Sequence, residues 1–184
     1  MKKLFTAILL GFISIANAQV IIGDATGTAA VKTSVLLEFA AGQNKGIIVP
    51  YVRTMPTTPT EGTILLDAST PISSRMKYYA GSVKGWVDLS GQPADLSSTG
   101  VNVLAAQPAG ITEATTSKAI IGAATSAADG VLVLESTTKA MVLPTVADVQ
   151  NIPSPSPGMM VYVNKAGAKR LAVFNGSKWS FWKP

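Results

Sequence analysis

The sequence predicts a mainly β protein, built from two homologous small antiparallel β-modules in tandem after a cleaved signal peptide. Three observations lead to this prediction. Apolar runs are short, rich in Val, Ile and Thr, and separated by Gly and Pro, which is typical of strands and turns. Helical periodicity of the apolar residues is weak throughout. The same ordered series of short motifs also occurs twice along the chain, which indicates an internal repeat.

The N-terminal segment, residues 1–18, has the features of a signal peptide. Met1-Lys2-Lys3 is positively charged, and Leu4 to Ile15 is an apolar stretch shorter than the ~20 residues that a membrane-spanning helix needs. Ala16-Asn17-Ala18 then provides small side chains at the two positions that a signal peptidase reads. We expect cleavage before Gln19 and export of the mature chain, either secreted or to the cell surface, with the periplasm as an alternative.

The remaining chain contains two copies of one unit. We predict copy one at 19–90, an Ala/Ser/Thr-rich linker at 91–118 and copy two at 119–184. The paired segments are Ile21-Ile22-Gly23 with Ile120-Ile121-Gly122, Leu36-Leu37-Glu38 with Val133-Leu134-Glu135, Lys45-Gly46-Ile47-Ile48-Val49-Pro50 with Lys139-Ala140-Met141-Val142-Leu143-Pro144, Pro59-Thr60-Glu61-Gly62 with Pro155-Ser156-Pro157-Gly158, and Tyr79-Ala80-Gly81-Ser82 with Phe174-Asn175-Gly176-Ser177.

Each copy begins with two apolar runs. The first predicts a short strand, at 35–38 in copy one and 131–135 in copy two. The second run stops at Pro50 or Pro144, because proline has no N–H to donate to a β-ladder. In copy two, residues 146–151 are expected to form one helical turn.

Each copy ends with a third strand and a hairpin. The third strand is predicted at 63–66 and 159–163. In copy two, Asn175-Gly176 favours a type I′ turn, which needs φ > 0 at both central positions. A unit of ~55–70 residues buries only about 60% of its unfolded surface. We therefore expect each copy to pack against its twin or against other chains.

These motifs resemble a repeat found in secreted and surface proteins of Bacteroidota (flavobacterial-type) bacteria. Copy two carries the resemblance best, through Leu134-Glu135-Ser136-Thr137-Thr138-Lys139, Leu143-Pro144, Pro155 to Tyr162 and Phe174-Asn175-Gly176-Ser177-Lys178-Trp179. Copy one departs from the pattern at Ala80 and has a longer turn. Longer proteins with this repeat resemble fibres and adhesins. The resemblance therefore implies a structural or attachment role at the cell surface.

The composition excludes several kinds of chemistry. The chain has no Cys and no His, so it has no thiolate nucleophile, no Ser-His-Asp triad and no Cys/His zinc site. Ser136 and Lys139 have a Ser-x-x-Lys spacing, but they follow a strand and lack the partner motifs of such enzymes. The 15 basic and 10 acidic residues do not cluster, so we expect no nucleic-acid partner. We predict no enzyme activity, no cofactor, no metal and no transmembrane helix in the mature chain.

The aromatic side chains gather in the two hairpins. They could form the small cores, or they could form a surface for a ligand or partner; the candidate residues for that surface are Tyr78, Tyr79, Trp86, Phe174, Trp179 and Trp182. Our first functional hypothesis is a secreted, non-catalytic structural or adhesive protein that associates with itself or with other surface proteins. The alternative is a protein that binds a carbohydrate or surface polysaccharide through these aromatics.

Overall fold

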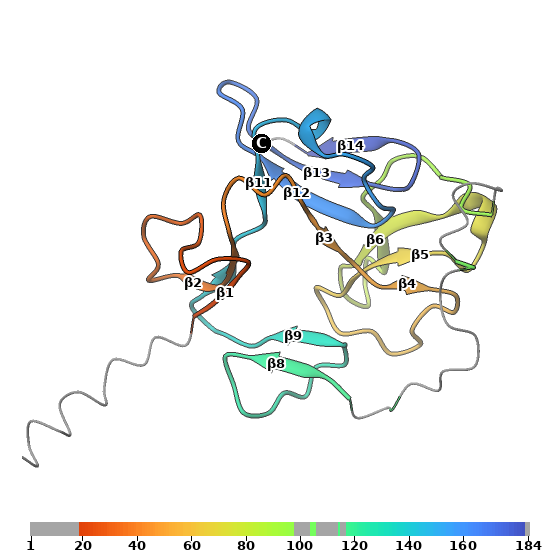
Figure 1. Cartoon of the computed structure of the whole chain (residues 1–184). Helices are drawn as coiled ribbons and strands as arrows, with labels where there is room; N and C mark the ends of the chain where they lie inside the picture. Colours follow the sequence, from red (N-terminus) through yellow and green to blue (C-terminus); the bar gives the residue numbers. More distant parts are fainter. Residues whose placement is uncertain (1–18, 98–103, 106–113, 115–116, 183–184) are drawn as a thin grey trace, which may run out of the picture.

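A computed structural model describes residues 19–97, 104–105, 114 and 117–182 (Figure 1). The predicted signal peptide and most of the predicted linker lie outside these residues. The described chain is mainly β, as predicted. Its strands are β1 (Val20–Ile22), β2 (Val35–Phe39), β3 (Ile47–Ile48), β4 (Tyr51–Val52), β5 (Ile64–Asp67), β6 (Arg75–Tyr79), β7 (Trp86–Asp88), β8 (Ala119–Ile121), β9 (Leu132–Leu134), β10 (Ala140–Met141), β11 (Thr145–Val146), β12 (Met159–Val163), β13 (Arg170–Phe174) and β14 (Trp179–Trp182).

The second half of each copy has the same strand order. Copy one forms the sheet β4-β5-β6-β7, and copy two forms β11-β12-β13-β14. In both, the first pair is parallel and the next two pairs are antiparallel hairpins. The carbonyls of Pro50 and Pro144 accept hydrogen bonds from the N–H groups of Leu66 and Tyr162, 2.9 Å in each case. Proline therefore interrupts the second apolar run in both copies while its carbonyl still joins the next sheet.

The two copies share sheets. Strand β3 of copy one pairs antiparallel with β12 of copy two, with Ile48 opposite Met159. In return, β10 of copy two pairs parallel with β2 of copy one, with Met141 opposite Leu37. Each copy thus contributes a two-residue strand to a sheet of the other, which agrees with the expectation that a copy packs against its twin.

Packing across the two copies also joins their cores. One buried cluster combines residues of both copies with the start of the predicted linker; its members are Leu66, Ala68, Met76, Leu89, Ala94, Leu96, Leu104, Met160 and Val173. A second cluster, which includes Val146, Val161 and Ala172, belongs to copy two alone. Ala94 and Leu96 are buried, and Ala94 bridges Ser74. The linker sequence therefore begins with residues that complete the shared core.

The turn after β13 differs from the predicted type I′ turn. Gly176 has a φ of 108°, but Asn175 is outside the positive-φ region, so the prediction for this turn was wrong. The Asn175 carboxamide oxygen accepts hydrogen bonds from the N–H groups of Ser177 and Lys178, each 2.9 Å long. These side-chain bonds close the turn, so the backbone does not need a second left-handed residue.

Two short 3-10 helices complete the described structure. The segment η1 (Pro71–Ser73) joins β5 to β6, and η2 (Val149–Asn151) lies between β11 and β12. The Asp148 side chain accepts a hydrogen bond from the N–H of Gln150 at the start of η2. This helix lies within the helical turn predicted at 146–151, although Val146 itself belongs to a strand.

Candidate functional site

The predicted aromatic surface is divided between two equivalent ring pairs. Tyr79 and Trp86 lie across the β6–β7 hairpin, with ring centroids 5.3 Å apart and planes tilted by 54°. Phe174 and Trp179 lie across β13–β14, with centroids 5.2 Å apart and a tilt of 43°. Tilted aromatic pairs at this separation are favourable beyond the area that they bury. All four side chains are half-buried, so both hairpins use their aromatics for packing.

Tyr78 and Trp182 have different surroundings. Tyr78 is half-buried and packs against the cluster shared by both copies. Trp182 is 47% exposed, and its Nε1–H donates a 2.8 Å hydrogen bond to the carbonyl of Leu89 in copy one. Two residues earlier, the Ser180 hydroxyl donates to the carbonyl of Ser90. One face of β14 therefore joins copy two to copy one through these two hydrogen bonds.

Phe181 is an exposed aromatic that the list of candidate residues omits. Its side chain is 43% exposed, and the Arg170 guanidinium carbon lies 4.3 Å from its ring centroid. A cation over an aromatic face is an attractive contact. The alternation of side chains along β14 places Phe181 on the face opposite Trp182, and this signal was available in the sequence. The structure leaves only Phe181 and Trp182 exposed among the hairpin aromatics of the described chain.

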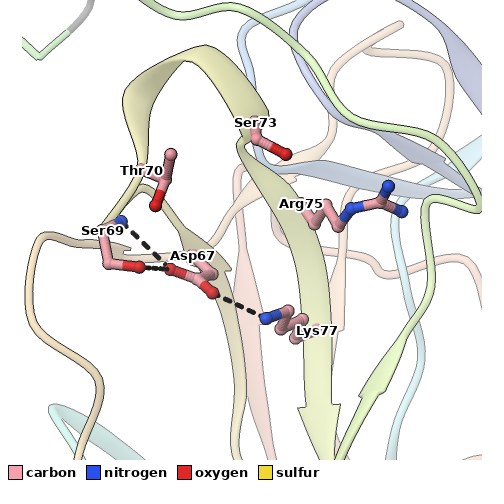
Figure 2. Close-up of a pocket in the computed structure, with 6 residues that line it drawn as sticks. All are labelled: Asp67, Ser69, Thr70, Ser73, Arg75 and Lys77. Carbon is pink, nitrogen blue, oxygen red and sulfur yellow. Dashed lines mark hydrogen bonds and ion pairs between the residues drawn. The ribbon is translucent and has the colours of Figure 1, made fainter.

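A polar hollow of about 250 Å³ lies beside the β5–β6 hairpin (Figure 2). The Lys77 ammonium lies 2.7 Å from one Asp67 oxygen, while the other accepts hydrogen bonds from the N–H and hydroxyl of Ser69. Arg75 points away from this group and pairs with Asp88. The residues that line the polar hollow are Asp67, Ser69, Thr70, Ser73, Arg75 and Lys77.

The electrostatics of this hollow stabilise the hairpin. Burial raises the pKa of Asp67, but hydrogen bonds from Lys77 and Ser69 outweigh burial and hold that pKa below its ordinary value. Asp88 behaves in the same way: burial raises its pKa, and hydrogen bonds from Ser90 and Arg75 bring it below the ordinary value. Both carboxylates therefore stay ionised and paired. Neither is a carboxyl group poised near neutral pH, as a general acid or base requires.

Glu38 is a buried charge in β2. Its side chain has no exposed surface, and it pairs with the Lys32 ammonium. Its carboxylate also accepts hydrogen bonds from the Gln19 carboxamide and from the N–H of Ala29. Burial raises the pKa of Glu38, but these partners together hold it below the ordinary value. These contacts hold the loop before β2, which contains Ala29 and Lys32, against the strand.

Glu38 and Glu135 do not have equivalent positions in the fold, although their sequence motifs align. Glu38 lies opposite Ile21 in the β1–β2 pair, whereas Val133 lies opposite the matching Ile120 in the β8–β9 pair. Glu135 comes after β9, is exposed, and accepts a hydrogen bond from the Ser126 hydroxyl. The pairing of Glu38 with Glu135 in the sequence alignment is therefore wrong, because the strand registers make Val133 the equivalent of Glu38.

The described residues show local structural roles for the remaining motifs. The Ser136 hydroxyl oxygen accepts a 2.9 Å hydrogen bond from the N–H of Lys139, which caps a turn. Within the described ranges, no three His, Cys, Asp or Glu side chains gather closely enough to hold a metal ion. No helix in those ranges is long and apolar enough to cross a membrane.

Residues 120–183 match the family model of the phage tail like trimerisation region. This segment covers β8 through β14, so the similarity concerns copy two of the repeat. No curated protein and no solved structure matches the chain.

Proposed function

We propose that this protein is an exported, non-catalytic structural protein whose chains assemble into trimers as part of a fibre-like or adhesive surface structure. The observation that carries the proposal is the similarity of residues 120–183 to a phage tail like trimerisation region. The similarity to repeats of Bacteroidota surface proteins points in the same direction, and the Ala16-Asn17-Ala18 motif supports export.

The fold supports this proposal through its shared sheets. Strands β3 and β10 each complete a sheet of the other copy, so the repeat is built to pair with a second repeat. Parallel and antiparallel strand addition of this kind also joins separate chains in many assemblies. The charged side chains that line the polar hollow are all in ion pairs, Lys77 with Asp67 and Arg75 with Asp88, which favours a structural role over a catalytic one.

Sedimentation velocity tests both the assembly and its shape. Purified chain from Gln19 to Pro184 should sediment as a species of three chains with an elongated shape. A globular single chain across the accessible concentration range would contradict the proposal. Export is tested separately by N-terminal sequencing of protein secreted from a bacterial host, where the expected first residue is Gln19.

Polysaccharide binding is the second proposed function, and the exposure of Phe181 and Trp182 favours it. Sugars stack on exposed aromatic faces, and these two rings lie on opposite faces of β14, so each ring offers a separate stacking surface. A glycan array with the wild-type chain and with Phe181→Ala tests it. Binding that is lost in Phe181→Ala would support this function, and the absence of any bound glycan would contradict it.

A further inference from the structure

Among the residues that the structure describes, the sheet β8–β9 has two strands, whereas the equivalent sheet around β2 has three. In copy one, β1 pairs parallel with β2, and β10 adds to the far side of β2. In copy two, β8 pairs parallel with β9, and no third strand joins them among the described residues. An isolated two-stranded sheet is marginally stable at best in water. The repeat therefore leaves one strand position open.

The strand registers show which residues are equivalent. Val20 lies opposite Leu37, and Ala119 lies opposite Leu132. Val20 and Ala119 each precede the matching Ile-Ile-Gly motif, so Leu37 and Leu132 occupy the same place in the two sheets.

The exposure of these positions shows what the third strand covers. Leu36 and Leu37 are 2% and 1% exposed, whereas their equivalents Val131 and Leu132 are 58% and 49% exposed. Two neighbouring large aliphatic side chains that stay exposed do not contribute the stabilising free energy that their burial would give. The open position in copy two thus combines an unpaired strand edge with apolar side chains that are buried in copy one.

The hydrogen-bonding groups at this edge are also available. The carbonyl of Val131 accepts a 2.9 Å bond from Ala119, and the N–H of Glu135 donates a 2.9 Å bond to Ile121. Odd-numbered residues of β9 therefore face β8. Because backbone groups alternate along a strand, the N–H and carbonyl of Leu132 face the open edge. In copy one, the equivalent carbonyl of Leu37 accepts a 2.8 Å bond from the N–H of Val142, at the end of β10.

The repeat also identifies the strand that fits this edge. The motif that contains β10 aligns with the motif that contains β3, so Met141 corresponds to Ile47 and Val142 to Ile48. One edge of β3 is occupied by β12, and the N–H of Val49 donates to the carbonyl of Gly158 on that side at 3.1 Å. The N–H of Ile48 therefore faces the other edge. The Ile48 side chain is 49% exposed.

We infer that β3 of a second copy of this chain pairs in parallel with the open edge of β9. Ile47 of one chain lies opposite Leu132 of the other, and the Ile48 N–H donates to the Leu132 carbonyl. This contact repeats between chains the β2–β10 pairing that joins the two copies within one chain. Within a single chain, β3 is paired with β12 and not with β9.

The inferred contact is head-to-tail, because it joins copy two of one chain to copy one of the next. Such a heterologous contact closes into a ring when the rotation allows it and otherwise grows into a filament. The inference rests on the proposed function and specifies the strands through which the chains would assemble.

Single-cysteine variants test the pairing, because the native chain contains no cysteine. Neighbouring strands lie ≈ 4.7–4.9 Å apart, which is within the Cα separation that a disulfide can bridge. Chains carrying Ile47→Cys and chains carrying Leu132→Cys are co-expressed and oxidised, and mixed dimers are identified by peptide mass spectrometry. The matched control replaces Ile47→Cys by Val83→Cys, whose position is 97% exposed but distant from β3 in sequence.

We expect the 47–132 disulfide to form several-fold more efficiently than the 83–132 control. An oligomeric protein that gives no more 47–132 product than control would overturn the inference and leave the proposed function standing. A monomeric wild-type protein would contradict both.

A charge at the open edge gives an independent test. Lysine at a strand edge disfavours the addition of another strand. Leu132→Lys replaces a side chain that is already half-exposed, so the chain should still fold. We expect Leu132→Lys to lower the mass of the oligomer. The wild type and the control Val31→Lys, a change at a 74% exposed site outside the strands, should keep their oligomer mass under the same conditions. Unchanged assembly of Leu132→Lys would count against the inference.

Discussion

Replacing Asn175 by alanine should destabilise the contact between the two copies. The Asn175 side chain has no exposed surface and makes three hydrogen bonds. Two of these close its own turn, and the third runs from its Nδ2 to the carbonyl of Gln92, 2.8 Å away. A hydrogen bond contributes about 0.5–1.5 kcal/mol net, so the three together are worth roughly 1.5–4.5 kcal/mol. Ser177 and Lys178 are exposed, and water can reach their freed N–H groups. The expected loss is therefore near the lower end of that range.

Urea unfolding followed by tryptophan fluorescence measures this loss. All variants are compared at one protein concentration, because assembly makes the apparent stability concentration-dependent. Asn164→Ala, at an exposed asparagine, is the matched control and should change the free energy of unfolding by less than about 0.5 kcal/mol. Asn175→Asp keeps the acceptor that closes the turn, but it places a carboxylate oxygen against the Gln92 carbonyl in a fully buried site, so it should destabilise the fold at least as much as Asn175→Ala. If Asn175→Ala unfolds like the control, this side chain does not link the copies.

Three further changes test the buried clusters by the same unfolding assay. Gly27→Ala should destabilise the fold because its Cβ would overlap the buried Glu38 side chain. The control Gly130→Ala should be nearly neutral, because its Cβ meets no atom closer than 3.8 Å. Equal effects of the two substitutions would refute this packing. The lowered pKa of Glu38 adds stability above the ordinary value of 4.5, and this stability is lost as the pH falls through the folded-state pKa. Glu38→Gln should therefore flatten the acid limb of the stability profile, and an unchanged limb would contradict the Lys32 pairing. Met76→Ala, at a fully buried position of the shared core, should cost about 2–5 kcal/mol, and a cost below 1 would contradict its placement.

Periodicity and motif order predicted most of the strands and their order. The β12 strand has the predicted bounds, and the two hairpins follow their aligned motifs. Pro50 and Pro144 mark real breaks because a missing N–H has the same effect in any fold. These features depend on residues that are close in sequence, and the repeat supplies each of them twice.

The exchange of β3 and β10 could not be predicted in this way. A two-residue apolar strand carries no signal for its partner, which here lies in the other copy and is chosen by packing. The prediction of the Asn175 turn was wrong for a similar reason. The Asn175 side chain makes hydrogen bonds to the backbone of its own turn and to the Gln92 carbonyl, which lies outside copy two. The aromatic candidates were found by composition, but the sheets decide that four of them form two packed pairs, that Tyr78 packs on the shared core and that Trp182 stays exposed.

Assembly of the chain is the central claim, and light scattering of the purified chain from Gln19 to Pro184 tests it most directly. The molar mass is measured across a concentration series. We predict a discrete mass of three chains that persists on dilution. A single-chain mass at every concentration would contradict the claim.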